Sequence, residues 1–154
     1  MRARTLLVRD VAVHSPVTVQ PEESITECAR RMHTEHVGCL IVVEQADGIP
    51  IPIGVLTDRD ITIEVVAFGL DPSAMTAGDI MSESPGVVEE DDDILQALAT
   101  MREHGARRLP VTGSNGALVG VIAFDNLLQA LAELLDSMVG VLKTQQTREL
   151  RTRP

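Results

Sequence analysis

The chain has 154 residues, of which 44% are hydrophobic, and its aromatic residues are two phenylalanines with no tryptophan or tyrosine. We therefore expect an aliphatic core, in one compact domain or in two small interlocked ones. The formal net charge of −10 disfavours general binding to nucleic acid, because an acidic surface repels phosphate backbones. The scarcity of aromatic rings also removes the platforms on which single strands stack.

The remaining composition points to an intracellular protein. No apolar run is long enough to cross a membrane and the first residues lack a signal-peptide segment, so we expect the cytoplasm. Cys28 and Cys39 form no CxxC pair, which favours reduced, structural thiols. Basic residues gather at both ends, and we interpret residues 143–154 as a basic, solvated C-terminal tail and not as a binding arm.

The first structural unit is predicted for residues 8–69. A short strand at residues 17–19 precedes an acidic helix start, and a buried strand follows at residues 39–43. A loop from residue 43 to 53, with a turn at Ala-Asp-Gly, leads to a second strand at residues 53–56 and then to a final helix. The first helix places apolar side chains at positions i, i+3, i+4 and i+7, namely Ile25, Cys28, Ala29 and Met32.

The same order of elements recurs in residues 77–142. An offset of 69 residues pairs Asp10 with Asp79, and after a shortened loop an offset of 66 pairs Gly54 with Gly120. The connector at residues 69–78 is short, so the two units should pack together. The sequence therefore predicts an α/β (α+β) fold with the order β-α-β-β-α twice, sharing one core about a pseudo-two-fold axis.

Two motifs in this arrangement resemble the cystathionine-β-synthase (CBS) domain pair, as found in small stand-alone bacterial proteins. They are residues 54–61, Gly-Val-Leu-Thr-Asp-Arg-Asp-Ile, and residues 104–111, His-Gly-Ala-Arg-Arg-Leu-Pro-Val. The resemblance implies a regulatory module and not an enzyme. It also implies an adenosine-type ligand between the repeats, such as AMP, ADP or ATP, with S-adenosylmethionine or NAD as other options. Such modules pair into disc-like homodimers and signal to an effector protein, whose identity the sequence does not give.

Thr57 and Asp60 are the candidate ribose-binding residues. They flank a strand-to-helix turn, where a carboxylate can accept hydrogen bonds from both ribose hydroxyls. The alternative is that Thr57 caps the helix and Asp60 occupies its first turn. The two interpretations are equally compatible with the residues, and the family resemblance favours the ribose.

The second unit departs from this pattern. Ala123 and Asn126 replace the hydroxyl and the carboxylate, and Phe124 is expected to crowd the pocket. Arg107 and Arg108 precede the middle strand, where they can meet ligand phosphates bidentately or form a solvated pair near Glu103. We predict a single dominant site that combines Thr57 and Asp60 with these two arginines.

Other candidates carry less chemistry. Further residues expected to line the cleft are Pro16, Val17, Val37, Gly38, Pro110, Ile122 and Asn126. His33, His36 and Cys39 are interpreted as exposed or capping residues, so we predict no metal site and no required cofactor. No spacing suggests a catalytic triad or a carboxylate pair. The alternative function is a ligand-free interaction scaffold, which the altered second unit favours.

The final helix, expected at residues 126–143, is apolar on more than one side. Such a helix has to bury the excess apolar surface somewhere. We therefore predict a homodimer formed through this helix.

Overall fold

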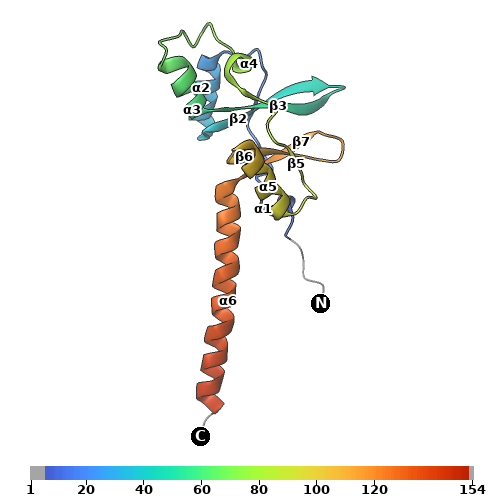
Figure 1. Cartoon of the computed structure of the whole chain (residues 1–154), viewed down its shortest axis with the longest axis vertical. Coiled ribbons are helices and arrows are strands. Elements are labelled where there is room, and N and C mark those ends of the chain that lie inside the picture. The colour runs from blue at the N-terminus through green and yellow to red at the C-terminus, as the bar shows by residue number, and fades with distance from the viewer. Residues whose placement is uncertain (1–5, 153–154) are drawn as a thin grey trace.

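The computed structural model describes residues 6–152, which form two small mixed sheets flanked by helices (Figure 1). The first sheet has the order β1-β2-β3-β4 and the second has the order β5-β6-β7. In each sheet the first pair of strands is parallel and the next pair is antiparallel. The strands are β1 (Thr18–Val19), β2 (Cys39–Ala46), β3 (Ile49–Thr57), β4 (Ser82–Glu83), β5 (Val88–Glu89), β6 (Arg108–Thr112) and β7 (Leu118–Ala123).

The helices complete the predicted mixed fold in both repeats. They are α1 (Val8–Val11), α2 (Ile25–Glu35), α3 (Asp58–Asp60), the π-helix η1 (Ile61–Val66), α4 (Ala77–Ile80), α5 (Ile94–His104) and α6 (Phe124–Thr152). The caps explain the limits of α2 and α5. The Ser24 hydroxyl accepts the Glu27 N–H and the Asp93 carboxylate accepts two backbone N–H groups. Both helices end at a left-handed residue, His36 or Gly105.

The first helix of each repeat packs into the core of the other repeat. This reciprocal exchange follows the expected pseudo-two-fold axis. Val8 of α1 is fully buried in the core of the second repeat, whereas Ala77 of α4 is fully buried in the core of the first. Val13 pairs antiparallel with Val121 of β7, and in the same way β4 pairs with β3. These partners are related by the offsets of 69 and 66 residues seen in the sequence.

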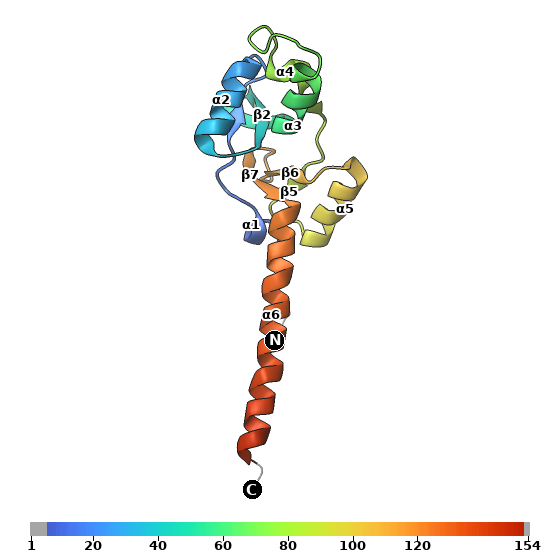
Figure 2. The ribbon, with the colours of Figure 1, turned by 90° about the vertical axis from the view of Figure 1, so that its left-hand side faces the viewer.

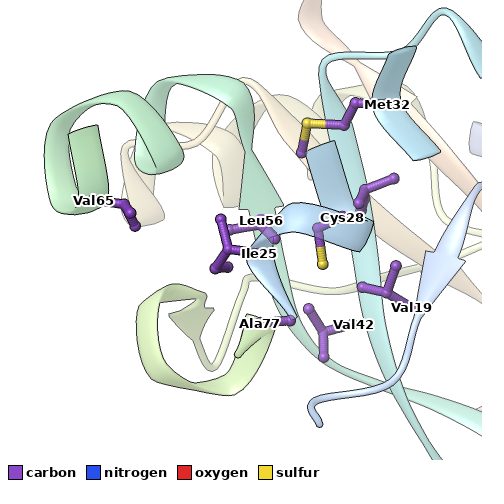
Figure 3. Close-up of a cluster of buried hydrophobic side chains, with 9 residues drawn as sticks. Val19, Ile25, Cys28, Met32, Val42, Leu56, Val65 and Ala77 are labelled. Carbon is purple, nitrogen blue, oxygen red and sulfur yellow. The ribbon is translucent and has the colours of Figure 1, made fainter. Parts of the chain in front are cut away.

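Three apolar clusters hold the repeats together. The first, drawn in Figure 3, lies between α2 and the first sheet and includes Ile25, Cys28 and Leu56. The second contains Leu109 and Ile122 and occupies the equivalent place. A third cluster, of Ile41, Val43 and Val55, also contacts Leu118 and Val121 from the other repeat. The expected shared aliphatic core is therefore present.

The expected loop from residue 43 to 53 is wrong, because these residues form most of a long hairpin between β2 and β3. Asp47 and Gly48 both have positive φ, 52° and 77°. Two successive left-handed residues give a turn whose twist matches the flanking strands, so pairing continues up to the turn. Pro50 and Pro52 lie within β3, and a bulge between Val42 and Val43 shifts the register beside them.

The final helix is longer than the expected residues 126–143. Helix α6 starts at Phe124 and runs to Thr152, so residues 143–152 of the predicted tail are helical, and residues 153–154 lie outside the described part of the chain. Figures 1 and 2 show α6 projecting away from both sheets. Over residues 6–152, no helix combines the length and the apolar character that crossing a membrane requires.

Candidate ligand-binding site

A cleft of about 280 Å³ lies between the two repeats. The first repeat contributes the segment before β1, including Pro16 and Val17, and the start of β2, including Gly38. The second repeat contributes Arg108 of β6 and Asn126 in the first turn of α6. Its mixture of apolar walls and a few polar groups is typical of small-molecule sites.

Thr57 and Asp60 form a reciprocal cap at the turn from β3 into α3. The Thr57 N–H and its hydroxyl donate to Asp60 Oδ2 at 2.8 and 2.7 Å, and the Asp60 N–H donates to Thr57 Oγ1 at 3.1 Å. The capping interpretation is therefore realised in this structure. It leaves Asp60 Oδ1, which has no hydrogen-bond partner within residues 6–152, as an available acceptor.

Asn126 makes the equivalent cap in the second repeat. The Ala123 N–H donates to Asn126 Oδ1 at 3.0 Å, in the same way that the Thr57 N–H donates to Asp60. Since a backbone N–H needs an acceptor, this bond fixes the orientation of the amide and leaves Nδ2 as the free group. Phe124 packs against the second core and does not line the cleft, so the expected crowding of the pocket is wrong.

The two arginines point to different places. Arg107 donates to Asp125 at 3.0 Å, and its guanidinium lies 5.9 Å from the centre of the Phe124 ring. Arg108 lines the cleft together with Asn126. Thr57, Asp60 and Arg107 are not among the residues that line this cleft, so the grouping of both arginines with Thr57 and Asp60 stays a prediction.

The Cys39 thiol lies within electrostatic range of charged side chains from both repeats. Burial raises the pKa of its thiol to about 11, Arg108 opposes this rise, and Asp60 and Asp58 add to it. Arg108 and Asp60 therefore act on the same thiol.

Several cleft residues differ from those expected. Pro16, Val17, Val37, Gly38 and Asn126 line the cleft. Ile122 lies in the second core with no exposed surface and Pro110 is buried in β6, and neither is among the residues that line this cleft. The sequence analysis missed Val121, and the signal for it is the cross-repeat pairing with Val13, which has no local pattern.

His33 and His36 face different cavities. His33 faces a groove beside η1, whereas His36 lies at the cleft. Within the described residues, no three His, Cys, Asp or Glu side chains are grouped so that they can hold a metal ion.

Comparison with known proteins defines the class. Residues 8–67 and 77–133 each match the family model of the CBS domain. The chain therefore belongs to the CBS-domain family and is a tandem CBS pair.

Particular relatives cover most of the chain. The uncharacterised protein MK0525 of Methanopyrus kandleri is 34% identical over 143 residues, which are 93% of this chain and 71% of that protein. The AMP complex of the CBS domain protein PAE2072 from Pyrobaculum aerophilum is 29% identical, with a TM-score of 0.74 over 85% of this chain and 97% of that one. Hypoxic Response Protein I, in a crystal structure with two coordinated zinc ions, is 32% identical, with a TM-score of 0.69 over 80% of this chain and 97% of that one.

Proposed function

We propose that this CBS pair is a regulatory module that binds an adenosine nucleotide between its repeats. The observation that carries the proposal is the turn at Thr57, which holds Asp60 in place and leaves one carboxylate oxygen unused. Arg108 lies within electrostatic range of the same region, at Cys39. The similarity to a protein whose structure contains AMP supports this choice of ligand.

Each residue has a distinct role in the proposed site. Asp60 Oδ1 accepts hydrogen bonds from the ribose hydroxyls, while Thr57 positions the carboxylate through Oδ2. Arg108 meets the phosphate. Arg107 also binds the phosphate, and to do so it breaks its exposed ion pair with Asp125. Breaking this pair costs little, because a surface ion pair of this kind contributes little stability.

Signalling follows from the position of the ligand between the repeats. The central cluster of Ile41, Val43 and Val55 is one apolar contact that the repeats share. A ligand that binds one arrangement of the repeats more tightly than another shifts the population towards that arrangement. An effector protein, or the assembly of two copies through α6, then reads out the change.

Calorimetry on Asp60→Ala tests the proposal. A hydrogen bond to a charged group contributes on the order of 1.5–3 kcal/mol, so affinity for AMP or ATP should fall roughly ten- to a hundredfold. Asp79→Ala is a matched control, because Asp79 makes the same kind of cap with Thr76 in α4. It should cost similar stability but leave binding unchanged.

The outcomes separate two functions. If Asp60→Ala binds like the parent, the ribose site is wrong. If the parent binds none of AMP, ADP, ATP, NAD and S-adenosylmethionine, the module is a ligand-free scaffold. That second candidate is favoured by Asn126, which replaces the carboxylate in the second repeat.

A further inference from the structure

The charges of α6 are divided between its two halves. Residues 139–152 carry three basic residues against one acidic residue, and this half projects away from the sheets. Residues 124–138, beside the sheets, carry three acidic residues and no basic one. These acidic residues are Asp125, Glu133 and Asp136. The helix therefore has an acidic half and a basic half.

The stability of a single helix does not explain this division. The helix dipole favours acids at the start and bases at the end, but its effect is confined to the first and last turns. Glu133, Asp136 and Lys143 lie in the middle of the 29 residues of α6. Their charges are therefore better explained by a partner that lies along the helix.

A groove of about 560 Å³ lies beside the acidic half. It is bounded by α1, the start of α5 and the first turns of α6, which lie close together in Figure 2. Leu131 and Leu134 line it and are more than half exposed. Asp10 and Glu133 also line it, and none of the described residues that line it is basic. The groove therefore favours an occupant that is apolar and positively charged.

The apolar side of α6 fits a second copy of the helix in either direction. Leu131, Leu135, Met138 and Leu142 are exposed and lie along one side. In a parallel pair each of them faces its own equivalent. In an antiparallel pair centred between Leu135 and Met138, these two face each other, and Leu131 faces Leu142. Both directions bury the same four side chains.

The charges separate the two directions. A parallel pair places the acidic halves side by side and the basic halves side by side, so like charges repel along its whole length. An antiparallel pair places each basic half beside the acidic half of the other copy. It also brings residues 139–152 of one copy to the groove of the other, where Asp10 and Glu133 lie.

We infer that two copies of this chain pair through antiparallel α6 helices, with the basic half of each against the acidic half and the groove of the other. This inference concerns assembly and does not depend on the proposed nucleotide site. The apolar side holds the two copies together, and the charges select their direction. The two pairs of repeats then lie at opposite ends of the helix pair.

Disulfide cross-linking of the full chain distinguishes the two directions. In the antiparallel pair Leu128 of one copy faces Gln145 of the other, whereas in a parallel pair Gln145 faces its own equivalent. The two positions are 17 residues apart. They are thus separated by about 25 Å along the helix, far more than the roughly 4 Å between the Cβ atoms of a disulfide.

Two samples are compared under mild oxidation. Co-expressed Leu128→Cys and Gln145→Cys chains should give a cross-linked dimer, and mass spectrometry should assign the bond to the two introduced thiols. Gln145→Cys alone should give no more cross-linking than the parent, which controls for Cys28 and Cys39.

Charge reversal tests why the direction is chosen. Glu133→Lys with Asp136→Lys gives both halves a positive charge, so the cross-link between positions 128 and 145 should fall severalfold. Adding Lys143→Glu and Arg148→Glu restores opposite charges and should restore the cross-link. All four side chains are exposed in a single chain.

Glu35→Lys with Glu44→Lys is the matched control. It makes the same change in net charge at two exposed positions on α2 and β2, and should leave the cross-link unchanged. Cross-linking of Gln145→Cys alone would show a parallel pair and overturn the inference. A monomeric parent, or a dimer that cross-links in neither sample, would also overturn it. A cross-link that resists the Glu133→Lys, Asp136→Lys reversal would overturn the role of the charges.

Discussion

At the scale of residues, Arg107 and Arg108 show how neighbours in the chain take different roles. Arg107 reaches Asp125 and the Phe124 ring, while Arg108 lines the cleft. The sequence gives both the same charge and the same position before a strand. Arg107 lies just before β6 and Arg108 is its first residue, and only the direction of each side chain in the structure separates them.

This difference predicts how the pair affects nucleotide binding. The double variant Arg107→Ala, Arg108→Ala should weaken AMP and ATP roughly tenfold or more, because charged hydrogen bonds to phosphate are lost, but it should change adenosine little. Calorimetry with the three ligands gives the comparison. An equal loss for adenosine would show that the arginines support the fold of the site and do not contact phosphate.

From the two buried cysteines we predict that the free energy of unfolding decreases at alkaline pH. Burial raises the pKa of Cys28 and of Cys39 from 9.0 to about 11. The folded state thus disfavours the thiolate, so this contribution to stability is complete below pH 9.0 and is lost as pH rises towards about 11.

Urea unfolding at pH 8 and pH 10.5 measures this effect. The free energy of unfolding should fall more in the parent than in the Cys28→Ala, Cys39→Ala variant, which lacks both thiols. The variant should still bind nucleotide within a few-fold of the parent. An identical pH dependence in the two proteins would contradict the prediction, because ionisation of the thiols would then not lower the free energy of unfolding.

At the scale of elements, the sequence predicted the order β-α-β-β-α in each repeat, because the chain carries this order twice, but it did not predict α1, α4 and β4. It could not predict the exchange of α1 and α4 between the cores, since Val8 and Ala77 meet partners far along the chain. The π-helix η1 was also missed. Its apolar spacing, at Ile61 and Val65, fits an ordinary helix equally well.

The candidate site was predictable only in part, for the same reason. Thr57 and Asp60 form a local pattern, so both of their possible roles were visible in the sequence. The orientation of the Asn126 amide depends on one hydrogen bond to Ala123 and becomes visible only in the structure. Val121 reaches the cleft through pairing with Val13 of the other repeat.

Two glycines should respond to alanine with opposite signs. Gly48 has φ of +77° in the β2–β3 turn, so Gly48→Ala should destabilise the protein by about 1 kcal/mol. Gly140 lies inside α6, and an added Cβ there meets no atom within 4 Å. Gly140→Ala should therefore stabilise α6 by about 0.5–1 kcal/mol. Thermal unfolding of both variants is the measurement, and a common sign would contradict the two backbone assignments.

At the scale of the whole molecule, α6 is the element whose apolar side chains stay exposed in a single chain. Its 29 residues correspond to about 43 Å of helix. Leu131, Leu135, Met138 and Leu142 are between 52% and 60% exposed. Their spacing of four, three and four residues places them along one side, the pattern by which two helices pack together. The repeats therefore do not absorb this apolar surface internally.

A second copy of the chain, with its own α6 against this side, is the partner that we predict. Light scattering at micromolar concentration should give the mass of a dimer. Leu135→Glu with Met138→Glu should give a monomer that keeps its helix content, because both side chains are exposed within one chain. Thr144→Glu with Thr147→Glu adds the same charge on other sides of α6 and should leave the dimer intact. A monomeric parent would contradict the prediction, since the exposed leucines would then have no partner in solution.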